Sequence, residues 1–154
     1  DHFKALNDTL GHQEGDHYLQ KVGAVLQSCS NRASDLCARI GGDEFALVLG
    51  NTDRENAEIL VGKILTGIDL LGINIQDEIG NAVFGASAGL ITCYPEGNHQ
   101  PEDILKQADD LLYQAKSYKG SKLISATLEK TEFEILNNPD IEKAPRDISR
   151  EALE

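Results

Sequence analysis

The sequence predicts an α/β fold of the α+β type, in which helices pack against a sheet. Three observations lead to this prediction. Helical and extended patterns alternate along residues 1–127, apolar residues make up 40% of the 154-residue chain, and a glycine-rich turn joins two short apolar runs. A chain of this length accommodates one domain with a core of its own.

The first expected element is helical and runs from Phe3 to about Ser28. Its apolar residues share one helix face and comprise Tyr18, Leu19, Val22, Val25 and Leu26. Gly11 and Gly15 interrupt the stretch, so we expect a break between two helices there. Two apolar runs, residues 36–40 and 45–49, then flank Gly-Gly-Asp-Glu, which predicts a β-hairpin.

A second helix is expected after Thr52 or Asp53, either of which can cap it. Its apolar stripe recurs every four residues, at Leu60, Ile64 and Ile68, and Gly72 is expected to end the region. Alternation at residues 73–75 indicates a short strand, and residues 81–94 are expected to form one further strand.

Pro101 occupies the first position expected of a third helix. The apolar face of that helix comprises Ile104, Leu105, Ala108, Leu111, Leu112 and Ala115. Residues 122–127 are expected to form the last strand. With one strand before residue 1, the order becomes a β-α-β-β-α-β core with an added helix and strand, which is a ferredoxin-like palm. We therefore expect a domain over residues 1–127 that lacks its first strand in this chain.

Composition limits the kinds of partner. The net charge of −12 argues against a nucleic-acid-binding or membrane-surface protein, because both need a basic surface. It leaves nucleotide substrates open, and no apolar run is long enough to span a membrane. The three cysteines lack CxxC spacing and are expected to be buried in a reducing cytosol, so we expect a cytoplasmic domain, alone or in a membrane-anchored protein. Residues 128–154 are acidic and aperiodic, which predicts a linker or weakly ordered tail.

Two motifs carry the candidate chemistry. In Gly41-Gly42-Asp43-Glu44-Phe45, glycines allow close approach of backbone to phosphate, and the carboxylates can hold a divalent cation and accept a proton. A Gly-Gly-Asp segment between strands is more often only a turn. The string DHFKALNDTLGHQEGD over residues 1–16 adds the second motif, some 25 residues upstream.

Together these motifs resemble the GGDEF family, the diguanylate cyclases, over about residues 1–125. The resemblance implies condensation of two GTP into cyclic di-GMP with release of pyrophosphate, supported by Mg²⁺ or Mn²⁺, across a homodimer. It implies that Asp43 and Glu44 are catalytic and bind metal, and that Glu44 helps to ionise the attacking 3′-hydroxyl. It further implies that Asn7 and Asp16 read guanine. The residues implied around the triphosphate are Phe3, Lys4, Gly41, Gly42 and Lys116.

A second site is indicated by Arg32 and Asp35, three residues apart and just upstream of the hairpin. Taken alone, the pair is more often a surface ion pair of little energetic value. The resemblance instead implies the family's inhibitory product site, to which Lys63 on the second helix would contribute a further cation.

Two departures from the family pattern stand out. A metal-binding aspartate of the family falls two residues before Asp1, and the Gly-Arg-Asn or Gly-Lys-Asn that usually follows Lys116 is replaced by Ser-Tyr-Lys-Gly-Ser-Lys. We therefore expect the 154-residue chain alone to be inactive or weak, within a longer parent protein carrying other domains. The alternatives are a degenerate GGDEF domain that binds cyclic di-GMP or GTP as a signalling module, and another palm-fold nucleotide cyclase, against which Asn7 and Asp16 argue.

Overall fold

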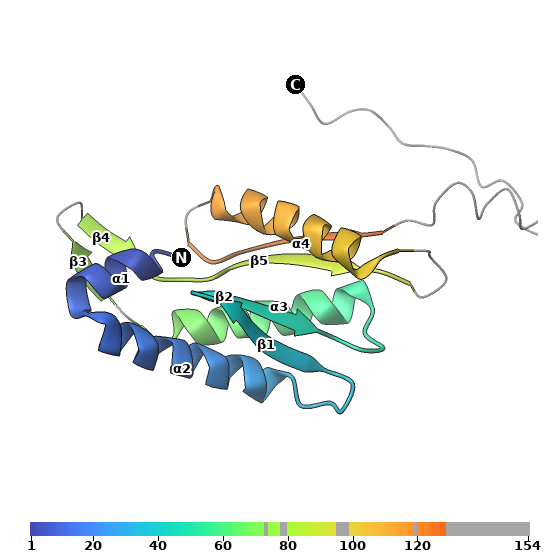
Figure 1. The fold of residues 1–154 in the computed structure, drawn as a ribbon, viewed down its shortest axis with the longest axis horizontal. Helices are drawn as coiled ribbons and strands as arrows, with labels where there is room; N and C mark the ends of the chain where they lie inside the picture. Colours follow the sequence, from blue (N-terminus) through green and yellow to red (C-terminus); the bar gives the residue numbers. More distant parts are fainter. Residues whose placement is uncertain (73, 78–79, 95–98, 119, 129–154) are drawn as a thin grey trace, which may run out of the picture.

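A computed structural model describes residues 1–72, 74–77, 80–94, 99–118 and 120–128 (Figure 1). Its elements are α1 (Phe3–Leu10), α2 (His12–Cys29), β1 (Leu36–Gly41), β2 (Glu44–Val48), α3 (Arg54–Asp69), β3 (Asn74–Asp77), β4 (Gly80–Val83), β5 (Ser87–Thr92), α4 (Pro101–Lys116) and β6 (Lys122–Thr127). The alternation of helices and strands confirms the predicted mixed α/β class.

The strands form three pairs. β1 pairs with β2 and β3 with β4, both antiparallel, whereas β5 pairs with β6 in parallel. Between residues 1 and 128, no hydrogen-bonded ladder joins one pair to another in the described segments. Since parallel neighbours need a crossover, the helix α4 that connects β5 to β6 completes a β-α-β unit.

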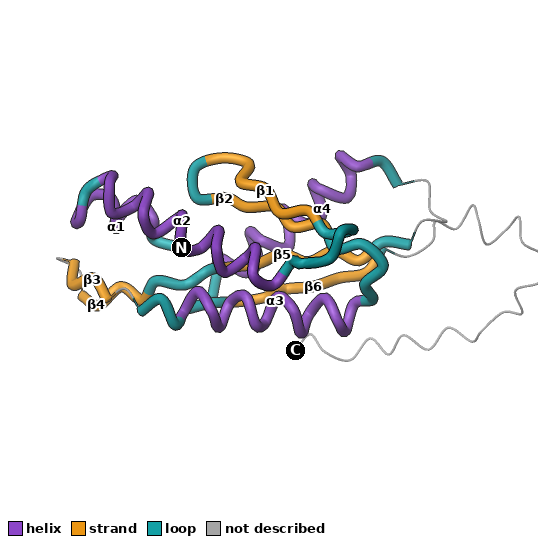
Figure 2. The backbone as a smooth tube through the Cα atoms, turned by 90° about the horizontal axis from the view of Figure 1, so that it is seen from below, coloured by secondary structure: helices purple, strands orange, loops and turns teal. Residues whose placement is uncertain are grey.

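Helices cover both sides of the parallel pair. α4 and α3 lie on opposite sides of β5 and β6 (Figure 1). α2 runs beside α3 (Figure 2), and the β3–β4 ribbon lies at one end against α1. The β1–β2 hairpin contacts α2, the helix that contains the end of the N-terminal motif.

The core forms where α1, α2 and α3 meet. Its buried members are Leu6, Tyr18, Val22, Leu26, Ile64, Ile68 and Phe84. The predicted stripe of the second helix is confirmed, because Ile64 and Ile68 are buried and Leu60 packs against them. On α4 the predicted apolar face is only partly covered: Ala115 is fully buried, whereas Leu105 remains 59% exposed.

The helix boundaries follow most of the predicted signals. The predicted break between two helices is confirmed at Gly11, which separates α1 from α2 with φ of 87°, but Gly15 lies inside α2 and is not part of the break. Asp53 caps α3 by accepting the Asn56 N–H, and Thr52 is not the cap. Pro101 begins α4 as predicted.

The prediction of one strand over residues 81–94 was wrong, because this segment contains β4 and β5 with a break between them. In the break, the Ala86 N–H donates to the Ser121 hydroxyl, and the Gly85 carbonyl accepts from the Asp1 nitrogen. A Cβ on Gly85 would lie 2.5 Å from the Ser121 Oγ. Backbone groups that bond elsewhere cannot continue a ladder, and the close approach of Ser121 requires glycine.

The cysteines differ in exposure. Cys29 and Cys37 are half-buried against the core, whereas Cys93 is exposed, which corrects the expectation that all three are buried. Burial raises the pKa of the Cys37 thiol, which disfavours the reactive thiolate. No helix in the described ranges is both long and apolar enough to cross a membrane. The predicted tail lies outside the described residues from position 129 onward.

Candidate functional site

The Gly-Gly-Asp-Glu segment closes the β1–β2 hairpin. Arg39 pairs with Phe45 and Gly41 with Glu44, and the register shifts by one residue between these pairs. Gly42 has φ of 43°, a left-handed conformation that favours glycine. A Cβ on Gly41 or Gly42 would meet nothing within 4 Å. The outer side of this turn is therefore open, and a phosphate could approach its backbone.

Strand alternation places Arg39 on the inner face of the hairpin, the face that is turned toward the core. Its neighbours on that face, Cys37, Phe45 and Leu47, pack against the core. The Arg39 Nε donates a hydrogen bond of 2.9 Å to the Gly42 carbonyl oxygen, so this side chain ties the strand to the turn. A bond from a guanidinium is among the stronger hydrogen bonds in proteins.

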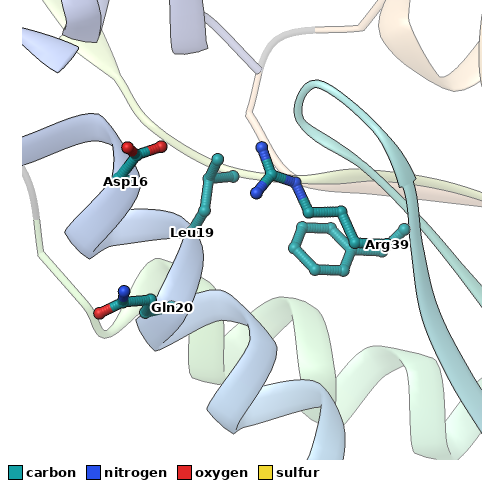
Figure 3. A pocket seen from close by; sticks show the side chains of 5 residues that line it. Asp16, Leu19, Gln20 and Arg39 are labelled. Carbon is teal, nitrogen blue, oxygen red and sulfur yellow. The ribbon is translucent and has the colours of Figure 1, made fainter. Parts of the chain in front are cut away.

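A pocket of about 420 Å³ lies between the hairpin and α2. It is lined by Asp16, Leu19, Gln20, Arg39 and Phe45. Figure 3 shows the Asp16 carboxylate and the Arg39 guanidinium extending into the same space, with Leu19 between them. An exposed acceptor, an exposed multiple donor and apolar walls suit a planar polar ligand such as a nucleobase.

The other N-terminal candidates lie on α1. Lys4 is exposed, Phe3 is half-buried against the core, and the Asn7 Oδ1 is buried with no hydrogen-bond partner among the described residues. Gly15 on α2 lies against Asn7 and Phe3, since a Cβ there would meet both side chains. Asn7 does not line the pocket at Asp16, but the glycine that it contacts directly precedes Asp16.

Charges from three distant segments meet near Asp1. The Asp1 nitrogen is partly buried, and both the Asp43 carboxylate and the Lys116 ammonium act on it electrostatically. Lys116, in the last turn of α4, and Asp43, in the hairpin turn, are therefore both close enough to influence the same group. The Asp1 carboxylate accepts the Ser87 hydroxyl at 2.7 Å.

The carboxylates of the hairpin turn supply some, but not all, of the ligands that a divalent cation needs. Asp43 and Glu44 are adjacent, exposed carboxylates. Among the described residues, no cluster of three or more His, Cys, Asp or Glu side chains is arranged to hold a metal ion. Mg²⁺ commonly binds one or two carboxylates and completes its shell with waters and substrate phosphates. Two carboxylates at an open turn therefore suit a metal that arrives with a nucleotide.

The segment after Lys116 carries its cations differently from the pattern expected there. The Lys122 Nζ lies 5.0 Å from the centre of the Tyr118 ring, in a cation–π arrangement. Lys119 lies outside the described residues. Gly120 has φ of 77°, and Ser121 bonds to Ala86 and Asp69. The described part of this segment therefore joins the start of β5 to the end of α3 through hydrogen bonds.

A second pocket, of about 160 Å³, brings together the three residues of the other candidate site. Arg32, Asp35 and Lys63 all line it. The Arg32 guanidinium donates to the Thr52 hydroxyl at 3.1 Å, while the Asp35 carboxylate accepts a hydrogen bond from the backbone N–H of Arg32. The structure therefore does not contain the surface ion pair between the Arg32 and Asp35 side chains that was the alternative interpretation of this motif.

Comparison with known proteins settles the family. The sequence matches the family described as "Diguanylate cyclase, GGDEF domain" over residues 1–122. This chain belongs to the GGDEF family. It is 36% identical over 117 residues to the probable diguanylate cyclase DgcE of Escherichia coli, covering 76% of this chain and 10% of that protein. It is 34% identical over 126 residues to the diguanylate cyclase DgcM of the same species, covering 82% and 29%.

Other relatives widen the range of activities. The cyclic di-GMP phosphodiesterase NbdA of Pseudomonas aeruginosa is 36% identical over 117 residues, covering 76% of this chain and 14% of that protein. The chain spans less than a third of each of these relatives. Among solved structures, DgcB of Caulobacter crescentus, in complex with c-di-GMP, is similar with a TM-score of 0.66 and 25% identity. That match covers 82% of this chain and 65% of the DgcB chain.

The isolated GGDEF domain of PA1120 from Pseudomonas aeruginosa gives a further structural match. Its TM-score is 0.62 at 30% identity, and the match covers 84% of this chain and 78% of that one. Together the structural matches confirm the palm-like α/β fold that the sequence predicted.

Several residues at the two pockets of this GGDEF domain were not predicted. Arg39 at the first pocket could have been found, because strand alternation places it on the inner face beside a turn. The second pocket adds residues from distant segments: Cys29, Leu49, Thr52, Asn56, Ile59 and Leu60. No local pattern joins them to Arg32, since it is the packing of α3 beside α2 that brings these segments together.

Proposed function

We propose that this GGDEF domain, within its full-length protein, condenses two GTP molecules into cyclic di-GMP. The observation that carries the proposal is the pocket shared by Asp16 of α2 and Arg39 and Phe45 of the hairpin, directly beside the open Gly41-Gly42 turn. It offers a base-sized, partly polar space next to a backbone that a triphosphate can approach.

In this proposal the guanine lies toward α1 and α2. The Asp16 carboxylate accepts from the N1–H and the 2-amino group of guanine, and the Asn7 carboxamide contacts the same base. Adenine presents a different donor and acceptor pattern, so a site built on these residues would favour guanine. Phe3 and Lys4 on α1, beside Asn7, extend the site toward the ribose and triphosphate.

The triphosphate would lie along the Gly41-Gly42 backbone, with Lys116 neutralising part of its charge. Asp43 and Lys116 both act electrostatically on the Asp1 position, which supports this arrangement because it puts a carboxylate and an ammonium near one point. Asp43 and Glu44 would hold Mg²⁺ or Mn²⁺. When bound, that cation would supply charge neutralisation at the α-phosphate.

The chemical step would form a bond from the 3′-oxygen of one GTP to the α-phosphorus of the other. The bond from that phosphorus to the oxygen of the β-phosphate breaks, and pyrophosphate leaves. Glu44 would accept the proton of the 3′-hydroxyl. A second, equivalent step closes the ring. One domain with one nucleotide supplies only half of the reactants, so a two-fold symmetric homodimer is the natural arrangement.

The pocket at Arg32, Asp35 and Lys63 supports a product-binding role in the same domain. A guanidinium can donate two bonds to the guanine edge, and Lys63 adds a positive charge for a phosphodiester. This pocket also favours the second candidate function, in which the domain binds cyclic di-GMP or GTP and signals without turnover. The altered segment after Lys116 argues in the same direction, because a lysine cannot replace the two-pronged contact of an arginine.

One experiment separates the two functions. The full-length protein is incubated with GTP and Mg²⁺, and the products are separated by chromatography. The appearance of cyclic di-GMP and pyrophosphate supports the cyclase. Tight binding of cyclic di-GMP by calorimetry, without any turnover of GTP, would establish the binding module instead. Turnover of ATP at an equal rate would refute the guanine assignment.

A further inference from the structure

Gly15 leaves a space that two candidate substrate-site residues occupy. It is buried in the first part of α2. A Cβ added there would lie 1.9 Å from the Asn7 Oδ1, 3.0 Å from the Asn7 Cγ and 3.2 Å from the Phe3 Cζ. The first of these distances is far shorter than any real contact, so an alanine at this position would force the Asn7 side chain to move.

The backbone does not explain why position 15 is a glycine. Gly15 is not among the glycines with a left-handed φ, so any residue could adopt its conformation. Gly23, in the same helix, is surrounded by open space within 4 Å of a built Cβ. Because glycine weakens a helix interior, its presence at position 15 calls for a local reason, and the contact with Asn7 supplies one.

The orientation of Asn7 depends on its surroundings. Its Oδ1 is buried, and none of the described residues donates a hydrogen bond to it. A buried carbonyl without a partner is unfavourable, so such an orientation persists only where packing holds it. Packing does so here, since Leu6, its neighbour on α1, is fully buried and the Gly15 N–H bonds to the Gly11 carbonyl at the junction of α1 and α2.

We propose that Gly15 is a positioning residue for base specificity, because its missing side chain gives Asn7 the space for its base-reading orientation. This inference rests on the proposed function, in which Asn7 reads guanine. Two adjacent residues of α2 thus contribute to base recognition in different ways. Gly15 sets the orientation of Asn7, and Asp16 supplies the carboxylate of the pocket.

The test compares Gly15→Ala with Gly23→Ala, the same substitution in the same helix. Calorimetry with Mg²⁺ measures the affinities of the full-length protein for GTP and for ATP. Gly15→Ala should weaken GTP binding about tenfold while ATP binding changes by about twofold or less, so the preference for guanine falls. Gly23→Ala should leave that preference unchanged and raise the Tm by about 2–5 °C. An unchanged preference in folded Gly15→Ala would overturn the inference.

A second pair of variants separates this inference from the proposed function. If Gly15 acts through Asn7, adding Gly15→Ala to Asn7→Ala should cause no further loss of preference. If Asn7→Ala alone leaves the preference intact, Asn7 does not read the base, and both the present inference and the Asn7 assignment within the proposed function fail, whereas synthesis of cyclic di-GMP is tested separately by the product assay. If Asn7→Ala lowers the preference but Gly15→Ala does not, only the present inference fails.

The same pair covers the case in which Gly15→Ala does not fold. Asn7→Ala removes the side chain that the new methyl group would meet. The double variant should then recover a cooperative thermal transition, which would support the proposed contact. A double variant that remains unfolded would show that Gly15 is required for another reason, and would overturn the inference.

Discussion

The Nε of Arg39 lies 2.9 Å from the carbonyl oxygen of Gly42 and donates a hydrogen bond to it. One side chain on β1 thereby holds the turn that carries Asp43, and its guanidinium also lines the pocket that contains Asp16. The turn and the pocket are thus coupled through a single residue.

Replacing Arg39 should disturb that turn without unfolding the domain, because its side chain is exposed. Arg39→Ala removes a charged hydrogen bond of about 1.5–3 kcal/mol, so we expect turnover of GTP to fall about 10- to 100-fold. The rate of pyrophosphate release, measured beside the Tm, checks this. Lys106→Ala, a loss of one exposed positive charge on α4, is the control. A turnover equal to wild type would show that the turn needs no support from Arg39.

Removing either carboxylate of the turn should abolish synthesis of cyclic di-GMP. Asp43→Ala and Glu44→Ala leave a metal with too few ligands or a 3′-hydroxyl without a base, and such losses commonly reduce kcat by about 10²- to 10³-fold or more. Both residues are exposed, so the Tm should change little. Product formation is followed by chromatography. Near wild-type turnover by Asp43→Ala would exclude the cyclase mechanism proposed above.

Selectivity for guanine should depend on Asp16. Asp16→Ala removes the only carboxylate that lines the pocket beside the hairpin in the described structure. We expect the Kd for GTP to rise at least about tenfold, with a much smaller change for ATP. Glu14→Ala, which removes another exposed carboxylate of α2, provides the charge-matched control. Equal effects of Asp16→Ala on both nucleotides would mean that this carboxylate does not contact the base.

Product binding should depend on Arg32. Arg32→Ala removes the guanidinium from the smaller pocket, and we expect cyclic di-GMP to bind at least about tenfold more weakly, with less product inhibition. Thr52→Val keeps Arg32 but removes its hydrogen-bond partner, so it should have a smaller effect. Calorimetry measures both variants, with Lys21→Ala as a control for charge. Initial turnover should remain, and an unaltered affinity in Arg32→Ala would place product binding elsewhere.

The hydrogen bond from Ser125 of β6 to Glu58 of α3 should make the stability of the domain depend on pH. Hydrogen bonds from Ser125 and Arg54 hold the pKa of the Glu58 carboxyl below its ordinary value of 4.5. A carboxyl whose pKa is lowered by folding stabilises the protein above the unfolded pKa, and this contribution disappears as the pH falls through the folded pKa.

Glu58→Gln should therefore lower the urea midpoint at pH 7, and the difference from wild type should shrink below about pH 4. Asp109→Asn, an exposed carboxylate on α4, is the control. A difference that is the same at both pH values would show that the charge of Glu58 contributes nothing to the link.

Much of the fold could be predicted from local patterns. The hairpin was predicted because two apolar runs flank a turn-forming segment, and the bounds of β6 and the start of α4 were read correctly from residues 122–127 and Pro101. The failures share a cause. Gly15 looks like a helix breaker, and residues 81–94 look like one strand, until Asn7 and Ser121 are brought against them from elsewhere in the chain.

The sequence by itself determined the family and the identity of the candidate chemical groups. Each of the two motifs is a continuous run of residues, and the residue types in it define the available chemistry. Tertiary structure alone decided which groups meet. It placed Arg39 against Gly42, gathered Arg32, Asp35 and Lys63 with Thr52, and gave Asn7 its space beside Gly15. The physical reason is that such contacts join residues brought together by helix and hairpin packing, and local sequence patterns carry no information on that packing.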